Sequence, residues 1–163
     1  MTADTGGLRI REAVRALLLD PDDRVLLVRF EFPDGTRWAL PGGGLDESES
    51  HVDALRRELD EELGLTDVEV GPHIWDRLHI IPFIDGRWDG QHDRIHLVRL
   101  DRAFEPQPRL SWEELRAEYL FEIRWWRPDE ITDGLPFVPR ELRRHLDDLR
   151  RDGPPKRPVD VGV

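Results

Sequence analysis

Three glutamates, Glu58, Glu61 and Glu62, are the side chains of this sequence best placed to do chemistry. They belong to the run RELDEEL, residues 57–63. At about 100° per residue of a helix, they fall within an arc of roughly 100°. Carboxylates one turn apart repel each other unless a cation lies between them. Oxygen-only ligands of this kind suit hard ions such as Mg²⁺ or Mn²⁺, so the spacing favours a divalent metal site.

A helix over residues 50–63 is predicted to carry these carboxylates. The segment contains no Gly or Pro, and its apolar residues recur at spacings of three and four: Val52, Leu55, Leu59 and Leu63. Such spacing gives one apolar stripe along a helix. Ser50 followed by Asp53 is a capping-box start, with Asp in place of the usual Glu or Gln, and Gly64 is a natural stop. The glutamates then lie beside the stripe, where the helix meets the body of the protein.

A glycine-rich loop, residues 42–44, precedes the helix. Glycines let the backbone adopt conformations closed to other residues and approach a ligand closely. The loop also lies near a helix N-terminus, which is a position suited to phosphate contact. Helices rich in Glu and Arg also occur as solvated faces braced by pairs such as Arg57 with Glu61. The loop, together with Glu49 and Gly64 at fixed offsets, favours a functional site over a solvated face.

The segment that begins at Gly43 fits the pattern G-x(5)-E-x(7)-R-E-U-x-E-E-x-G-U at every fixed position, where U is a bulky apolar residue. The matching residues are Gly43, Glu49, Arg57, Glu58, Leu59, Glu61, Glu62, Gly64 and Leu65. This segment resembles the Nudix box, and the chain resembles a Nudix hydrolase over residues 38–65 and more weakly elsewhere. Such enzymes use a divalent metal to hydrolyse a diphosphate that links a nucleoside to another group. In one departure, the glycine common before the first glutamate is Ser48 here, at a variable position of the pattern.

The resemblance implies a role for each conserved side chain of the box. The implied metal ligands are Gly43, through its carbonyl, with Glu58, Glu61 and Glu62. Instead of binding a further ion, Glu61 could take the proton of the attacking water. Bound metal would neutralise the phosphate oxygens and lower the pKa of that water. Arg57 is implied to pair with Glu49 and to lock the loop against the helix, so neither is expected to touch the substrate.

An acidic residue outside the box often joins the site in relatives. Glu122 is the first candidate for this catalytic role and Glu118 is the second. The alternatives are structural: Glu122 as a sheet-edge charge opposite Arg124, and Glu118 as a solvated helix residue. Sequence reasoning leaves both pairs of alternatives open.

Composition sets the outer limits of the prediction. A chain of 163 residues with 38% hydrophobic content suits one globular domain with a real core. Its net charge of −11 argues against a nucleic-acid polymer or a membrane surface as the main partner. Cysteine is absent, which excludes a disulfide, a thiolate nucleophile and a Cys-based metal site. No apolar leader and no stretch of transmembrane length is present, so a soluble cytoplasmic protein is expected.

The order of elements predicts an α+β fold. Predicted strands cover residues 10–19, 24–30, 38–40, 68–70, 73–84, 94–100 and 122–127, and predicted helices cover 50–63, 111–118 and 139–151. The first two strands form a hairpin. This order matches the Nudix fold, an α/β/α sandwich with a mixed β-sheet between helices. We expect one Nudix domain over residues 1–151 and a Pro-rich tail over 152–163, without regular structure at 153–158.

Two functions from different classes fit this sequence. The first is a Mg²⁺- or Mn²⁺-dependent hydrolase of a small nucleoside diphosphate derivative, such as a nucleotide sugar, ADP-ribose or a nucleoside triphosphate. The second is a Nudix-like binding module that senses a nucleotide without cleaving it. All three box glutamates are present, which favours the enzyme, because a sensor can lose ligands without penalty. Decapping of RNA 5′ ends is less favoured, since the sequence shows no Lys/Arg cluster near the box to form a basic groove. Family habit alone implies a homodimer.

Overall fold

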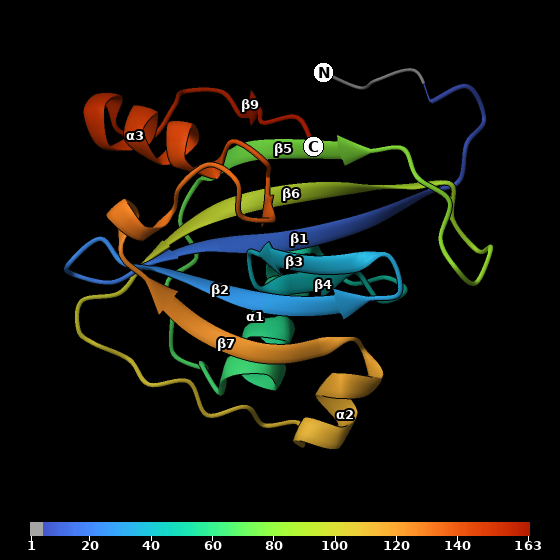
Figure 1. The fold of residues 1–163 in the computed structure, drawn as a ribbon, viewed down its shortest axis with the longest axis horizontal. Helices are drawn as coiled ribbons and strands as arrows, with labels where there is room; N and C mark the ends of the chain where they lie inside the picture. Colours follow the sequence, from blue (N-terminus) through green and yellow to red (C-terminus); the bar gives the residue numbers. More distant parts are fainter. Residues whose placement is uncertain (1–4) are drawn as a thin grey trace.

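A single mixed β-sheet organises the computed structural model of this chain, which describes residues 5–163 (Figure 1). Its strands are β1 (Ile10–Leu19), β2 (Val25–Phe32), β3 (Gly35–Ala39), β4 (Gly42–Gly44), β5 (His73–His79), β6 (Gly90–Arg99), β7 (Leu120–Trp126), β8 (Phe137–Val138) and β9 (Val159–Asp160). The helices are α1 (His51–Leu63), α2 (Trp112–Ala117) and α3 (Leu142–Asp152), with a 3-10 turn at Pro128–Glu130. The sheet order is β8-β3-β2-β1-β6-β5-β9, while β4 pairs with β1 and β7 pairs with β2.

Strand β1 is the centre of this sheet. It runs parallel to β6 along its whole length, from Ile10 opposite Gly90 to Leu19 opposite Arg99. Its other side is shared, because β4 pairs with its first half and β2 meets its last residue. The β1–β2 pair is antiparallel, which confirms the predicted hairpin. The glycine loop is therefore hydrogen-bonded to the central strand, with Gly43 opposite Val14.

Two hydrophobic cores lie on the two faces of the sheet. One core packs α1 and α2 against the sheet and includes Leu18 of β1. The other packs α3 and includes Leu17 and Leu19, as the alternation of side chains along a strand requires. The sheet thus lies between helices, which confirms the predicted α+β sandwich (Figure 1).

Helix α1 begins and ends as its sequence predicts. The Ser50 side chain accepts a hydrogen bond from the Asp53 backbone N–H, and Gly64 ends the helix in the left-handed region with a φ of 68°. A Cβ atom at Gly64 would lie 2.0 Å from the Gln107 carbonyl oxygen, so only glycine fits there. Val52 departs from the predicted stripe, since it is exposed while the neighbouring residue Ala54 is buried.

Several predicted elements are wrong in extent. Residues 68–70 form no strand, because pairing with β6 begins only where the Gly71 N–H meets the Leu97 carbonyl. The strand predicted over 73–84 ends at His79, and an exposed apolar segment that contains Pro82 follows it. Proline has no N–H to continue a ladder, so a regular strand could not have run through residue 82 as predicted. Helix α3 begins at Leu142, three residues later than predicted.

The tail after α3 packs back on the domain. Residues 153–158 have no regular structure, as predicted, but β9 then pairs in parallel with β5 (Figure 1). Val161 is buried, and its N–H donates to the Asp76 carbonyl at 2.9 Å. Residues 1–4 of the predicted domain lie outside the described part of the chain. Within residues 5–163, no helix has the length and apolar character needed to cross a membrane.

Candidate active site

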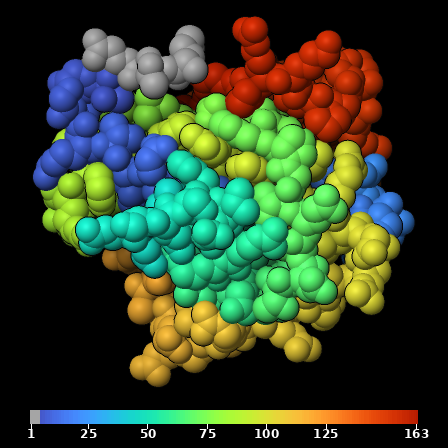
Figure 2. Space-filling model, turned by 180° about the vertical axis from the view of Figure 1, so that it is seen from behind, coloured from blue at the N-terminus to red at the C-terminus, as the bar shows by residue number. Residues whose placement is uncertain are grey.

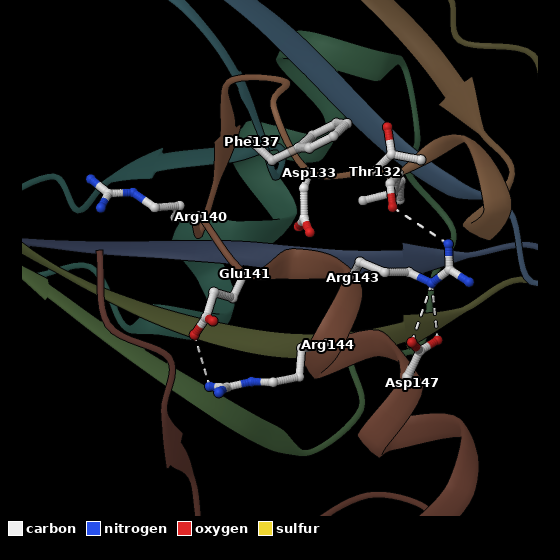
Figure 3. A pocket seen from close by; sticks show the side chains of 9 residues that line it. Thr132, Asp133, Phe137, Arg140, Glu141, Arg143, Arg144 and Asp147 are labelled. Atoms are coloured by element: carbon white, nitrogen blue, oxygen red, sulfur yellow. Dashed lines mark hydrogen bonds and ion pairs between the residues drawn. The ribbon is translucent and has the colours of Figure 1, made fainter.

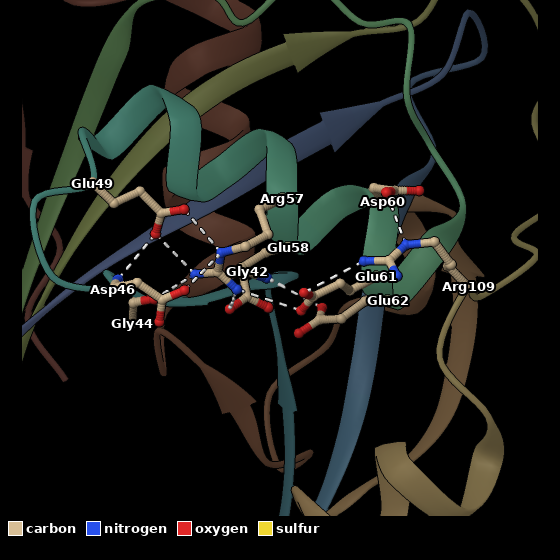
Figure 4. Close-up of polar contacts among 10 residues, drawn as sticks. All are labelled: Gly42, Gly44, Asp46, Glu49, Arg57, Glu58, Asp60, Glu61, Glu62 and Arg109. Carbon is tan, nitrogen blue, oxygen red and sulfur yellow. Dashed lines mark hydrogen bonds and ion pairs between the residues drawn. The ribbon is translucent and has the colours of Figure 1, made fainter.

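Helix α1 brings the three predicted glutamates to one edge of the glycine loop (Figure 4). Glu58 and Glu62 are buried, at 9% and 4% exposure, while Glu61 is half-buried. The Gly42 backbone N–H donates to Glu62 Oε2 at 3.3 Å. A Cβ atom on Gly43 would lie 2.5 Å from Glu58 Oε1, so the carboxylate rests directly on that glycine. The loop and α1 occupy the middle of one face of the molecule, in cyan and green in Figure 2.

The electrostatics of this pair are unfavourable without a further charge. Burial raises the pKa of Glu58 and raises that of Glu62 well above its ordinary value. For Glu62 the charge of Glu58 is the next cause, and Glu118 adds to the rise at both residues. A cation between such carboxylates would stabilise their charged forms. The donor set consists of oxygens only, which fits a hard divalent ion.

The carboxylates are held by protein groups in this structure. Glu58 Oε1 accepts from Arg57 Nη1 at 3.0 Å, and Glu62 accepts from the loop backbone. Among residues 5–163, no three His, Asp or Glu side chains already surround a position for a metal ion. Arg57 contacts only Oε1 of Glu58, so a divalent ion could bind beside this contact or replace it.

Arg57 forms the predicted link to Glu49. Its Nε and Nη2 atoms bind the two oxygens of Glu49 at 2.9 and 3.0 Å, and Nη2 also donates to the Gly44 carbonyl at 3.0 Å. A planar guanidinium can satisfy a carboxylate through two such bonds at once. Arg57 also reaches Glu61, at 3.4 Å. It therefore orients the site as well as locking the loop.

The backbone conformation of Ser48, the residue before Glu49, explains why glycine is common at this position of the family. Ser48 has a φ of 64°, in the left-handed region that favours glycine. The glycine common at this position of the family therefore has a backbone reason. In this chain a serine occupies that conformation at some cost in strain.

The structure separates the two candidate acids outside the box. The pKa of Glu118, at the end of α2, is raised by burial and by the charge of Glu61, so this carboxylate is within electrostatic reach of the box. Glu122 on β7 instead pairs with Arg29 on β2, with Nε and Oε1 3.1 Å apart. It does so in place of the anticipated partner Arg124. The geometry brings Glu118 toward the box glutamates and places Glu122 in an ion pair between strands.

A group of arginines beside the box was missed from the sequence. Arg15 donates from Nε to Asp93 at 2.9 Å and from Nη1 to the Leu40 carbonyl at 3.0 Å, just before the glycine loop. Arg77 shares the same carboxylate at 3.4 Å. The charges of Glu62 and Glu58 act on Arg15, which shows that the two groups are neighbours. The available signal was an arginine in the middle of an otherwise apolar strand.

A second ionic cluster lies on β1, β5 and β6. His92 lies between two carboxylates, with Nδ1 2.9 Å from Glu12 and Nε2 2.8 Å from Asp76. These hydrogen bonds raise the pKa of His92 to about 9, so the imidazole is protonated at neutral pH. His51, in the first turn of α1, approaches Glu12 at 3.4 Å. This cluster joins three strands and the start of the box helix.

A separate hollow of about 300 Å³ lies beside α3 (Figure 3). Its charged side chains are largely paired with each other, as Arg143 with Asp147 and Arg144 with Glu141. None of the box residues lines it. The chemistry of the carboxylates is therefore not located in this hollow.

A sheet between helices, a glycine loop and a helix of buried carboxylates together match the fold and the site that the sequence resemblance implied. The family profile described as the NUDIX domain matches residues 9–148, and the chain belongs to this family. An RNA pyrophosphohydrolase of Helicobacter pylori is 27% identical, and the match covers 89% of this chain and 96% of the relative. This protein is accordingly a Nudix hydrolase of the pyrophosphatase type.

Solved structures support the fold. The MutT protein of Methanosarcina mazei superposes with a TM-score of 0.65 at 17% identity, over 90% of this chain and 96% of the other. The NUDIX domain of Shewanella oneidensis NrtR, in complex with ADP ribose, gives a TM-score of 0.63 at 17% identity, over 92% and 94%. At these identities, the likeness establishes the fold alone.

Proposed function

We propose that this protein uses a divalent metal, Mg²⁺ or Mn²⁺, to hydrolyse the diphosphate linkage of a small nucleoside diphosphate derivative. The observation that carries the proposal is the buried pair of Glu58 and Glu62 against Gly43. Their pKa values stay raised although Arg57 and Arg15 act against the rise, so negative charge at this site is only partly compensated. Such a site suits a cation and the phosphates that accompany it.

The residues divide the work between holding the ion and moving a proton. Glu58, Glu62 and the Gly43 carbonyl would hold the ion. When bound, a divalent ion neutralises phosphate oxygens and lowers the pKa of the attacking water. Glu61 is half-buried, 3.4 Å from Arg57 and 3.5 Å from Arg109, and is the box glutamate that we assign to accept the proton of the attacking water.

Glu118 is our preferred additional acid. Its charge is coupled to Glu61, and it lies at the end of a helix that packs under the sheet. Glu122 stays a second candidate, because its bond to Arg29 would first have to break. A base is most effective when its pKa lies near the working pH, and a raised pKa moves Glu118 in that direction.

RNA 5′ ends are a second candidate substrate. The observation in their favour is the matched relative, which is named an RNA pyrophosphohydrolase. The net charge of −11 weighs against a long contact with a polymer, although it leaves room for the terminal phosphates alone. A nucleotide-sensing role is the contrasting alternative, and the intact set of glutamates disfavours it. A cytoplasmic location and a homodimer stay predictions.

The test is a hydrolysis screen with Mg²⁺ and with Mn²⁺. Substrates are nucleotide sugars, ADP-ribose, dinucleoside polyphosphates, nucleoside triphosphates and a short RNA with a 5′-triphosphate. Glu61→Gln is assayed alongside, with the exposed Glu69→Gln as a control that changes charge equally. We expect metal-dependent cleavage that is lost in Glu61→Gln and kept in Glu69→Gln. Tight binding of one compound without turnover of any would overturn the proposal in favour of a sensor.

A further inference from the structure

Three guanidinium groups from β1 and β5 lie within electrostatic reach of one buried carboxylate, and two of them bind it. Arg15 and Arg77 both bind Asp93, which is 1% exposed. Arg11 lies two β-strand repeats from Arg15, on the same face of β1, and donates from Nη1 to Gln91 at 3.1 Å. Within the described residues, Arg11 is the one of the three that forms no salt bridge. Asp93 therefore binds two of the three cations directly, and Arg11 has a neutral partner.

This imbalance is costly in a partly buried place. Charges removed from water need a partner of opposite sign, and an unpaired one is strongly unfavourable. The pKa values of Arg11 and Arg77 are lowered, first by burial and then, at both, by the charge of Arg15. Arg77 is 8% exposed, and its Nε atom has no hydrogen-bond partner in the described part of the chain. Asp93, Glu62 and Glu58 offset the burial of Arg15 and raise its pKa, so the shortage of negative charge falls on Arg11 and Arg77.

The position of Arg11 relative to the box is fixed by two consecutive glycines. A Cβ atom on Gly43 would lie 2.5 Å from Glu58 Oε1, and one on Gly44 would lie 2.3 Å from Arg11 Nη2. The carboxylate and the guanidinium therefore rest on neighbouring residues of the same strand, β4. The Phe83 ring supports the guanidinium from another side, with its centroid 5.9 Å away. Because successive residues of a strand face opposite sides of the sheet, the two groups flank β4, and the charge of Glu58 acts on Arg11 across it.

We propose that Arg11, backed by Arg15 and Arg77, forms a phosphate subsite next to the box carboxylates. It would select substrates that carry at least one phosphate beyond the diphosphate that is cleaved, such as a nucleoside 5′-triphosphate, over nucleotide sugars. This inference rests on the proposed function, because it assigns the substrate class of the same site. A guanidinium with free donors binds phosphate through two hydrogen bonds at once. Arg15 and Arg77 already use donors on Asp93, so Arg11 is the residue that contacts the ligand.

The first test is binding without metal, so that it does not depend on hydrolysis. Inorganic tripolyphosphate is titrated calorimetrically into the full chain in the presence of a chelator. We expect binding by the wild type and a loss of about tenfold to hundredfold in Arg11→Gln, as for one or two charged hydrogen bonds. Arg9→Gln removes the same charge from an exposed site that is paired with Asp89, and should bind as the wild type does. Equal binding by Arg11→Gln and the wild type would overturn the subsite.

The second test compares two substrates under hydrolysis conditions. In Arg11→Gln, kcat/KM for a nucleoside triphosphate should fall by about tenfold to hundredfold, while that for a nucleotide sugar changes by less than about threefold. Arg11→Lys, which keeps the charge but not the fork, should lie between the two. An equal fall for both substrates would show a structural role and overturn the proposal. Tripolyphosphate binding that needs Arg11, with no substrate hydrolysed, would instead leave the subsite standing and remove the proposed activity.

Discussion

Two ionic clusters of this protein are built from similar side chains and reach opposite electrostatic states. At the box, Glu58 and Glu62 are buried together, and burial and repulsion raise their pKa values. On the neighbouring strands, His92 lies between Glu12 and Asp76, and hydrogen bonds raise its pKa to about 9. The second cluster pairs its cation with a carboxylate on each side, whereas the contacts at the first leave the pKa values of both carboxylates raised. The two clusters do not differ mainly in their number of ionisable groups. They differ in how completely the charges are paired, and pairing is less complete at the box, the proposed functional site.

The two clusters are also connected. The Leu45 N–H, at the end of the glycine loop, donates to the Glu12 carbonyl at 3.1 Å. The side chain of the same Glu12 binds His92 and approaches His51 at the start of α1. The balanced cluster thus helps to hold the loop on which the unbalanced one is built. An unfavourable arrangement in a functional site commonly persists because the surrounding structure holds it in place.

Removal of one charge from the unbalanced cluster should give the largest effect. Glu62→Gln keeps an acceptor for the Gly42 N–H but removes a metal ligand, so kcat should fall by about a thousandfold, or about 4 kcal/mol. The measurement is steady-state hydrolysis with Mg²⁺ and the best substrate of the screen. Activity within tenfold of the wild type would contradict the assigned ligand role.

Arg57 contacts Glu49, Glu58 and Glu61, and its substitution tests how far the box depends on this one cation. Arg57→Gln leaves Glu49 without its bidentate partner and should lower the free energy of unfolding by about 3 kcal/mol, as measured by urea denaturation. Arg57→Lys should recover only part of this loss, because an ammonium cannot form both bonds. Full recovery by lysine would show that charge alone is needed.

The His92 cluster should make the free energy of unfolding depend on pH. Because the pKa of His92 is raised from 6.5 to about 9, its contribution to stability is complete below pH 6.5 and is lost as pH rises through about 9. The unfolding free energies of the wild type and of His92→Gln should differ by up to about 3 kcal/mol more at pH 6 than at pH 10. A difference that is independent of pH would exclude this ion pairing.

At the unbalanced cluster the variant, and not the wild type, should be the more stable protein in the absence of metal. The raised pKa of Glu62 means that its stabilising contribution is complete below about pH 4.5 and is lost as pH rises through the higher folded value. Metal-free Glu62→Gln should therefore be more stable than the wild type at pH 8, by about 1 kcal/mol or more, since each pKa unit corresponds to about 1.4 kcal/mol. The gain should vanish near pH 4 in thermal melts. A destabilised variant at pH 8 would mean that the pair is compensated after all.

Ser48→Gly, a substitution between the glycine loop and α1 that changes no charge, serves as a control for the stability changes above. Ser48→Gly replaces an exposed residue whose φ is 64° by one that adopts this conformation freely. Relief of strain is partly offset by the greater entropy of an unfolded glycine, so we expect a gain below about 1 kcal/mol. Neither ionic cluster is touched, and the pH dependence of stability should stay that of the wild type.

The parts of this site that could be predicted from sequence are local ones. The cap at Ser50, the stop at Gly64 and the spacing of the glutamates all lie within one helix and its ends. Each is fixed by the period of the helix and by the conformations that a terminal residue can adopt. The link from Arg57 to Glu49 also lies within the box.

The parts that could not be predicted depend on strand register. The positive group and the His92 cluster arise because β1 pairs in parallel with β6, which places Glu12 opposite His92 and Arg11 opposite Gln91. These partners are 80 residues apart, and no local pattern sets their alignment. The incorrect strand at 68–70 has a related cause, since short apolar runs do not reveal whether a ladder partner lies beside them.

The two-residue strand β9 also limits self-association. Without it, the seven-residue strand β5 would present unpaired N–H and C=O groups at an open edge, where another chain could add a strand. β9 covers this edge with a segment too short to template a neighbour, and Pro158 directly before it offers no N–H. The last residues of the chain therefore protect the sheet against aggregation as well as closing it.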